Sequence, residues 1–241
     1  MKKLTAVLTG LFFMANLSAS AVAADEEVLS HKQQSIVAIA SATASGSLDK
    51  LKVVLGQGLE AGLTVNEIKE VLVQIYAYAG FPRSLNGINT FMGLMEERRA
   101  AGIKDKEGPE ATPLPEDWDR DAYGAKVRAK LQGQEQIPAP SGYQLFAPTI
   151  DAFLKQHLFA DIFARDVLDY QSRELATISI LSSIPGLAPQ LKSHMNMAMN
   201  TGLSEAQMKA FIKVLGGSMG EQAAADAGAV LEGVLSARAG K

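Results

Sequence analysis

A long internal repeat constrains the fold of this 241-residue chain more than any other feature. Gly62-Leu63-Thr64 returns as Gly202-Leu203-Ser204, and the positions that follow keep the same offset of 140 residues as far as Gly80 and Gly220. No gap is needed to align the two segments. Self-similarity of this kind marks a structural unit that occurs twice. We therefore expect two equivalent halves that pack against each other.

Each half has the apolar periodicity of α-helices. Thr64 and Ser204 are suited to cap the helices that follow them, because their hydroxyls accept hydrogen bonds from free backbone N–H groups. After Thr64, the apolar residues lie on one helical face, at Ile68, Val71, Leu72, Ile75 and Ala79. Helices are expected over residues 29–45, 48–61, 65–79 and 83–101, and again over 171–184, 187–201, 205–217 and 220–237. The sequence thus predicts an all-α protein of two tandem helical repeats related by pseudo-twofold symmetry.

The ends of the repeats divide the chain into four segments. Residues 1–23 join a basic start to a short apolar run and finish with Ala21-x-Ala23, the pattern of a signal peptide. An uncleaved membrane anchor is the alternative, although the run is shorter than the ~20 residues that span a bilayer. Residues 24–101 and 148–241 hold the two repeats, and residues 102–147 form a linker or arm. We expect secretion across the inner membrane into the periplasm, with no membrane attachment after cleavage.

Two interpretations of the arm follow from its composition. Its prolines and its charged part, residues 104–121, are typical of a solvated linker. Its aromatic residues favour burial, so we expect the arm to wrap over a repeat or over a neighbouring subunit; they are Trp118, Tyr123, Tyr143 and Phe146.

The charge and the rare residues exclude several function classes. A net charge of -3 at pH 7 provides no basic surface for nucleic acid. The chain has no cysteine, which excludes disulfides, thiol chemistry and cysteine-based metal sites. The three histidines, His31, His157 and His194, lack the spacing of a metal site, so we expect no metal.

Two stretches together resemble the carboxymuconolactone decarboxylase family, which includes the alkylhydroperoxidase D-like proteins. The first is GLTVNEIKEVLVQIYAYAGFPRSLNG, residues 62–87, and the second runs from Leu168-Asp169-Tyr170-Gln171-Ser172-Arg173-Glu174 through His194 to Gly202. The resemblance implies a helical fold and a decarboxylase that uses no cofactor. Single-copy members form rings of six, so a chain with two copies is expected to form a homotrimer.

The departures from the family pattern exclude one of the family's activities and change where the site is expected. Peroxidase members carry Cys-x-x-Cys ahead of the motif histidine, where this chain has Leu187 and Gln190, so it is not a thiol peroxidase. The first copy has Val54 in place of the histidine but keeps the turn Tyr78-Ala79-Gly80-Phe81-Pro82. The second copy keeps His194 but reads Ser218-Met219-Gly220-Glu221-Gln222. We therefore expect one composite cavity that draws on both copies.

The resemblance assigns catalytic roles to three residues. His194 would donate a proton, and Tyr78 would hydrogen-bond the developing oxyanion. Glu174 would orient the ring of His194; the alternative is a surface ion pair between Glu174 and Arg173.

The substrate-binding residues are expected at the helix break. Gly80, Phe81 and Pro82 let one helix end and another start, which exposes N–H groups to an anion, and Arg83 would hold a carboxylate. A purely structural elbow is the alternative. Glu67 and Glu70 are expected to face solvent, and Glu70 is the better candidate for substrate binding.

These predictions favour a cofactor-free lyase that decarboxylates a small carboxylate or lactone. The competing hypothesis is a secreted, non-catalytic module of the same fold that binds a small molecule or serves in assembly. Secretion argues against the intracellular substrate that is usual for the family, so the substrate stays open.

Overall fold

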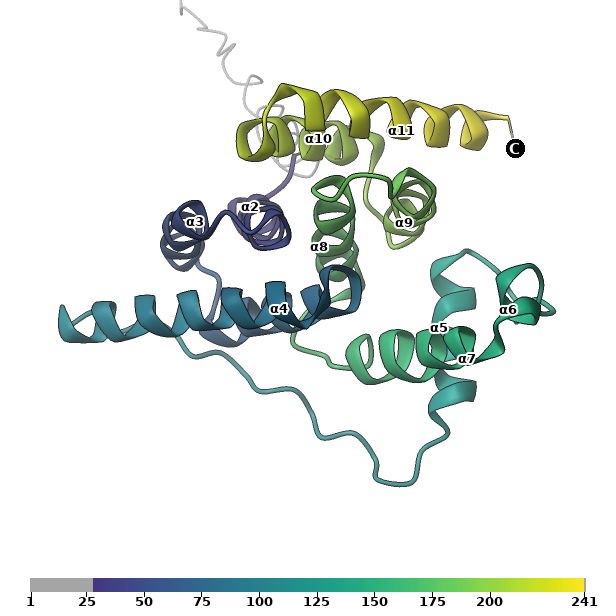
Figure 1. Cartoon of the computed structure of the whole chain (residues 1–241), viewed down its shortest axis with the longest axis horizontal. Helices are drawn as coiled ribbons and strands as arrows, with labels where there is room; N and C mark the ends of the chain where they lie inside the picture. The colour runs from purple at the N-terminus through teal and green to yellow at the C-terminus, as the bar shows by residue number, and fades with distance from the viewer. Residues whose placement is uncertain (1–27, 241) are drawn as a thin grey trace, which may run out of the picture.

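The computed structural model describes residues 28–240, and within this range the chain is helical without a strand. This confirms the all-α prediction, whereas the predicted signal peptide lies outside the described residues. No helix in the described range is long and apolar enough to cross a membrane. The elements are α2 (His31–Ser45), α3 (Leu48–Glu60), α4 (Val65–Ala100), α5 (Arg120–Leu131), α6 (Tyr143–Phe146), α7 (Pro148–Phe153), the π-helix η1 (Leu154–Ile162), α8 (Tyr170–Ser182), α9 (Ala188–Asn200), α10 (Glu205–Met219) and α11 (Glu221–Ala239) (Figure 1).

Helices α4 and α10 begin at the capping residues that the sequence predicted. Thr64 accepts a hydrogen bond from the backbone N–H of Glu67, whose side chain accepts one from the N–H of Thr64 in return. Ser204 and Gln207 form the same reciprocal capping box at the start of α10. Each box satisfies two N–H groups that a helix start leaves without a partner.

The predicted break between helices 65–79 and 83–101 is a kink within α4. Gly80 has φ 81° and ψ 161°, and Gly220 has φ 92° and ψ 168° between α10 and α11. Both conformations belong to the left-handed half of the φ range, which favours glycine because it has no Cβ. Two further pairs of glycines at the same offset also have positive φ: Gly46 with Gly186, and Gly62 with Gly202.

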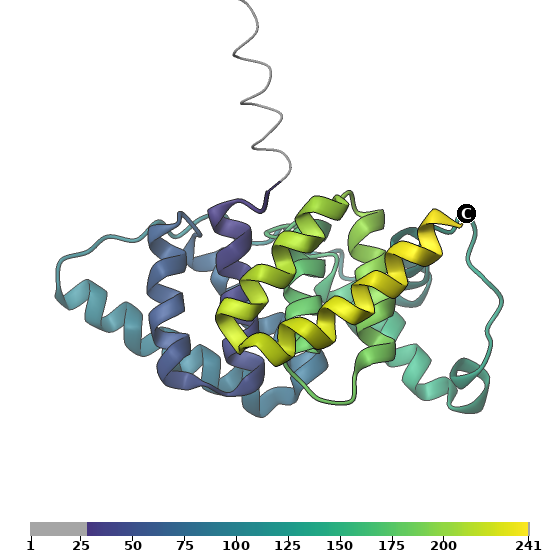
Figure 2. The same cartoon turned by 90° about the horizontal axis from the view of Figure 1, so that it is seen from above.

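The main core is built around α2, which packs against α3, α4, α8 and α10 (Figures 1 and 2). Its apolar residues Val37, Ile39 and Ala40 are fully buried. Helices α8 and α9 pack against each other, and α11 covers α10 and α9. The first and second halves of the chain therefore share one core rather than forming separate ones.

The segment predicted as a linker holds a second, smaller packed unit. Helix α5 packs against η1, and Gly124 lies so close to Lys155 that an added Cβ would sit 1.8 Å from the Lys155 carbonyl oxygen. A separate apolar cluster fills the space between them and reaches α9; it comprises Val127, Leu131, Leu158, Phe159, Ile162, Phe163 and Met197. The predicted boundary at residues 147 and 148 thus falls inside one packed unit.

The start of the arm lies along the beginning of α4. The backbone N–H groups of Val65 and Asn66 donate to the carbonyl oxygens of Lys106 and Glu107, at 3.0 and 2.9 Å. Gly108 follows, and an added Cβ there would overlap the Thr64 side chain. These N–H groups belong to the first turn of α4, where no carbonyl within the helix can accept from them. The arm is therefore part of the folded structure from its first residues.

Candidate active site

A buried acid–base pair joins α8 to α9. Asp169 caps the start of α8 by accepting from the Ser172 N–H, which orients the helix so that Glu174 faces inward. Glu174 is fully buried, and its Oε2 lies 2.9 Å from Nδ1 of His194 on α9. The His194 side chain is only 10% exposed. A carboxylate in this position fixes the tautomer and the orientation of the imidazole.

Tyr78 brings the first half of the chain to this pair. Its ring meets the ring of His194 edge to face, with centroids 5.6 Å apart. The Tyr78 hydroxyl oxygen accepts a hydrogen bond of 3.2 Å from Oγ1 of Thr177, which lies one turn after Glu174 on α8. Burial, and then the nearby charge of Glu174, raise the pKa of Tyr78 above its ordinary value of 10. The phenol is therefore neutral under ordinary conditions, and its proton is free to be donated.

A polar network behind the pair holds Thr177 in place. Nε2 of Gln74 donates to Oγ1 of Thr177 at 2.9 Å and to the Arg173 carbonyl oxygen at 2.8 Å. Nη1 of Arg173 in turn donates to Oε1 of Gln74 at 2.9 Å. Gln74, Thr177 and Arg173 are fully buried, so the network is shielded from water. It links α4 to α8 directly behind Tyr78.

The expectation that Glu70 faces solvent and binds substrate is wrong. Its side chain is 5% exposed, and its carboxylate accepts from Nε and Nη2 of Arg165, the latter at 2.6 Å, and from Nη2 of Arg173 at 3.0 Å. A carboxylate already held by two guanidinium groups has no capacity left for a substrate. Arg173 is thus the partner of Glu70, which leaves Glu174 to pair with His194 instead of forming the surface ion pair considered above. Glu67 is partly buried and pairs with Lys32.

Glu174 retains an unused hydrogen-bond acceptor. Its second oxygen, Oε1, is buried and has no partner among the described residues. A buried acceptor without a donor is costly, at about 1–3 kcal/mol. Such a group is characteristic of a site where a ligand or a moving proton completes the hydrogen bonding. No residue pattern indicates this unused acceptor, because it depends on which side chains surround α8.

Arg83 lies in a different place from His194. It is exposed and lines a hollow of about 320 Å³, with residues from the ends of α2 and α8 that include Ser45 and Ser183. Ser183 is nine residues from Glu174 along α8, which corresponds to roughly 13 Å at 1.5 Å per residue. The Arg83 guanidinium itself lies against Gly46 at the end of α2, where an added Cβ would be 1.3 Å from Nη1 of Arg83. The structure therefore brings Tyr78, Glu174 and His194 together but does not bring Arg83 to them.

The remaining residues of the predicted turn form an elbow. Phe81 is 64% exposed, and its ring stacks on the ring of Tyr76 with centroids 4.6 Å apart. Pro82 lies just after the kink at Gly80 and is also exposed. Gly80 has non-helical φ and ψ, so one helical limb of α4 ends there and a second begins, and Phe81 and Pro82 form the exposed outer side of this elbow.

The other two histidines do not join the site. His157 is exposed and pairs with Asp161 at 2.8 Å, and His31 is exposed at the start of α2. Within residues 28–240, no group of three or more histidine and acidic side chains could hold a metal ion.

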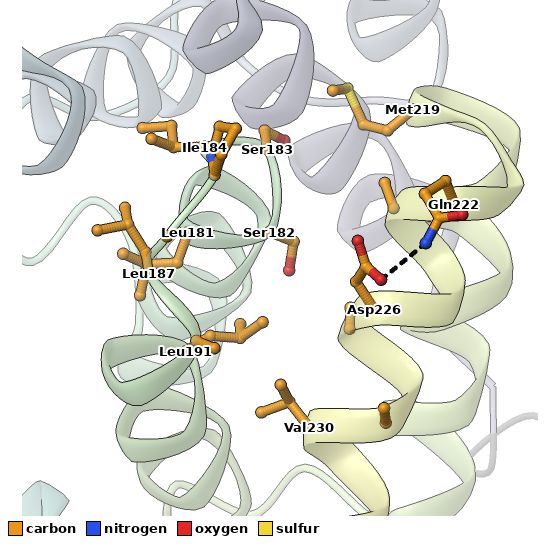
Figure 3. A pocket seen from close by; sticks show the side chains of 16 residues that line it. Leu181, Ser182, Ser183, Ile184, Leu187, Leu191, Met219, Gln222, Asp226 and Val230 are labelled. Carbon is orange, nitrogen blue, oxygen red and sulfur yellow. Dashed lines mark hydrogen bonds between the residues drawn. The ribbon is translucent and has the colours of Figure 1, made fainter.

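A larger pocket of about 620 Å³ lies between the turn that joins α8 to α9 and the start of α11 (Figure 3). Its walls are mostly apolar, and Ser182 and Asp226 point into it from opposite sides. Asp226 accepts a hydrogen bond of 2.8 Å from Gln222. No sequence signal pointed to this pocket, because its walls come from two regions about 40 residues apart.

Comparison with known proteins gives one family. No curated protein sequence matches the chain. Residues 12–90 match the model of the Carboxymuconolactone decarboxylase family, and this region contains α2, α3 and the part of α4 that carries Tyr78. The chain is thus similar to the Carboxymuconolactone decarboxylase family over residues 12–90, and its all-helical fold is consistent with that similarity.

Proposed function

We propose that this carboxymuconolactone decarboxylase-like protein is a cofactor-free lyase that decarboxylates a small carboxylate or lactone, with His194 as the proton donor. The observation that carries the proposal is the buried contact of 2.9 Å between Glu174 and Nδ1 of His194. Because Glu174 occupies Nδ1, the other ring nitrogen, Nε2, is the one that would transfer the proton. A positioned histidine of this kind contributes about 10²–10⁴-fold to a proton transfer.

The reaction needs a proton donor and a group that stabilises an oxyanion. The bond between the carboxylate and the ring carbon breaks, carbon dioxide leaves, and the electron pair moves towards the lactone carbonyl oxygen. Tyr78 donates a hydrogen bond to that oxygen, since its own oxygen already accepts from Thr177 and its proton is free. Nε2 of His194 then protonates the carbon, and Glu174 stabilises the charge of the imidazolium while it exists.

Arg83 and Glu70 have no part in this reaction. Arg83 lies at the far end of α8, and the carboxylate of Glu70 is saturated by two arginines. The site nevertheless draws on both halves of the chain, because Tyr78 comes from the first and His194 from the second. This contact supports a composite site with fewer members than the sequence suggested.

The organisation of the chain is part of the same proposal. We infer a tandem duplication, supported by three glycine pairs with positive φ and two capping boxes, all at the same offset of 140 residues. Secretion into the periplasm and assembly as a homotrimer are proposed from the sequence alone.

The test is the release of carbon dioxide from a panel of unsaturated lactone carboxylates, measured for the wild type and for His194→Gln, Glu174→Gln and Tyr78→Phe. His157→Gln is the matched control, because His157 is also paired with a carboxylate but lies on the surface. Far-ultraviolet circular dichroism checks the fold of each variant. We expect a loss of about 10²–10⁴-fold for His194→Gln and an unchanged rate for the control. Full activity in folded His194→Gln would overturn the mechanism.

The pocket in Figure 3 favours one alternative function, a small-molecule binding module. Its volume and its apolar walls are those of a ligand pocket, and it does not include His194. Amino-acid substitutions distinguish the lyase from the binding module. A binding module would turn over no member of the panel, and its ligand affinity would fall in Ala229→Arg, which places a large side chain at an exposed position of the pocket wall, but not in His194→Gln.

A further inference from the structure

The hydrogen bonds behind Tyr78 form a chain whose first member can only donate. Arg173 is fully buried on α8, and a guanidinium carries N–H groups but no acceptor. Its Nη1 donates to Oε1 of Gln74 at 2.9 Å. Nε2 of Gln74 donates to Oγ1 of Thr177 at 2.9 Å, and that hydroxyl donates to the hydroxyl oxygen of Tyr78 at 3.2 Å. We call these four residues the donor chain.

The orientation of the Gln74 amide decides the direction of the donor chain, and two contacts fix that orientation. The amide oxygen faces a guanidinium N–H of Arg173, and the amide nitrogen lies 2.8 Å from the backbone carbonyl oxygen of the same residue. Turning the amide over would place its NH2 group against a donor and its oxygen against an acceptor. Gln74 is fully buried, so water cannot satisfy the groups that this reversal would leave unpaired.

The direction passes from Gln74 through Thr177 to Tyr78. The Thr177 oxygen accepts from Gln74, and its single hydroxyl proton has the Tyr78 oxygen as its acceptor among residues 28–240. A phenol oxygen that accepts one hydrogen bond still carries its own proton, which it can donate to a second group. The rings of Tyr78 and His194 meet with centroids 5.6 Å apart, so the second group can be a ligand beside His194.

We propose that Gln74 is a positioning residue that makes Tyr78 a one-way hydrogen-bond donor, so that the ligand atom bound by Tyr78 must be an acceptor. Arg173 sets the direction, and Gln74 passes it to Thr177. A lactone carbonyl oxygen meets this requirement, whereas a ligand that presents only an N–H group would place a donor against a donor. The identity of the ligand atom rests on the function proposed above, but the direction of the donor chain does not.

The experiment is Raman difference spectroscopy of the Tyr78 phenol. The intensity ratio of the tyrosine Fermi doublet is high when the phenol oxygen accepts a hydrogen bond and low when the phenol only donates. Each spectrum is measured against the same protein carrying Tyr78→Phe, which isolates the signal of Tyr78. We expect a high ratio in the wild type.

Gln74→Glu should reverse the donor chain. A carboxylate has no N–H group, so it accepts from both Arg173 and Thr177, and the Thr177 oxygen then accepts from Tyr78. The adjoining cluster of Glu70, Arg165 and Arg173 holds one negative and two positive charges, which favours the ionised form of the new carboxylate. We expect the ratio to change from high to low. Gln57→Glu is the control, because it adds the same charge at an exposed position of α3.

Thr177→Val decides the question if Gln74→Glu does not fold. It removes the hydroxyl at nearly constant shape, so the ratio should fall, and Thr177→Ser should keep it high. The release of carbon dioxide should slow about tenfold in Gln74→Glu and in Thr177→Val, which corresponds to one hydrogen bond, and should be retained in Thr177→Ser.

The spectra and the rates separate this inference from the proposed lyase. A low ratio in the wild type, or an unchanged ratio in folded Gln74→Glu or Thr177→Val, would overturn the donor chain whatever the activity. If the wild type releases no carbon dioxide while the ratios change as expected, the lyase fails and the direction of the donor chain stands.

Discussion

Replacing Glu70 by glutamine should destabilise the protein far more than a surface substitution of the same kind. Glu70 is 4% exposed and accepts hydrogen bonds from Arg165 and Arg173, of which Arg173 is fully buried. The substitution removes the negative charge but leaves the Arg173 guanidinium in the core, where its Nε has no partner among residues 28–240. Loss of one member of a buried ion pair costs about 3–5 kcal/mol, because the other charge is left uncompensated.

That cost is large compared with the stability of a typical domain, which is about 5–15 kcal/mol. For a chain of this size it corresponds to a fall in Tm of roughly 6–20 °C. The matched control is Glu107→Gln, which removes the same charge from a surface pair with Lys69 in which Glu107 is 65% exposed. We expect the control to change the free energy of unfolding by less than about 0.5 kcal/mol.

Urea denaturation followed by circular dichroism measures both values. A loss for Glu70→Gln of less than about 1 kcal/mol, or one equal to that of the control, would refute the argument that Arg173 depends on Glu70 for compensation. Arg165→Met provides a second comparison. It should cost less than Glu70→Gln, because the Arg165 side chain is 41% exposed and Arg173 still compensates Glu70 when Arg165 is removed.

The same ion network predicts how the stability depends on pH. Burial alone would raise the pKa of Glu70, but the hydrogen bonds and charges of Arg165 and Arg173 outweigh it, and the pKa lies below the ordinary 4.5. The contribution of Glu70 is therefore fully present above pH 4.5 and is lost as the pH falls through the lowered pKa. The wild type and Glu70→Gln should differ by a constant amount at neutral pH and converge in acid.

Three further predictions concern single positions. Gly124→Ala should cost about 1–3 kcal/mol and increase hydrogen exchange in α5 and η1, since the new methyl group would overlap the Lys155 carbonyl oxygen; unchanged exchange would contradict this packing. Gly80→Ala should lower Tm, because an alanine at φ 81° is strained by about 1–3 kcal/mol; an unchanged Tm would mean that the kink tolerates a Cβ. Ultraviolet titration of the wild type against Tyr78→Phe should show no contribution from Tyr78 at pH 10, and ionisation there would contradict its burial beside Glu174.

Features of this fold that depend on near neighbours in the chain can be predicted from its sequence, whereas features that depend on distant residues cannot. Helix ends at Thr64 and Ser204 are set by residues three positions away, so they could be read directly. The environment of Glu70 could not be predicted from the sequence, because Arg165 lies 95 residues further along the chain and no local pattern indicates the pairing. Helix α5 within the arm was not predicted, because its apolar residues Val127 and Leu131 are buried by η1, which lies further along the chain.

The candidate site was predicted only in part, again because contacts between residues far apart in the chain leave no local pattern. The proximity of Glu174 and His194 came from a family resemblance, since two residues on different helices have no detectable relation in a single sequence. The break at Gly80 was visible, but its effect on Arg83 was not. Whether a residue just after a kink points to one end of α8 or to the other depends on the angle between the limbs, which the sequence does not encode locally.

The hydrogen bonds between the arm and the start of α4 set a limit on that angle. A straight helix from Val65 to Ala100 would be about 54 Å long. The chain returns from Ala100 to Lys106, which contacts Val65, in six residues, and these span at most about 21 Å. When the separation of the hydrogen-bonded residues Lys106 and Val65 is added to that span, the two limbs of α4, on either side of Gly80, must enclose an angle of roughly 60° or less. In mechanical terms α4 is a V whose two ends are connected by the six residues that follow the helix. Shortening those six residues would draw the limbs together and transmit the strain to Gly80.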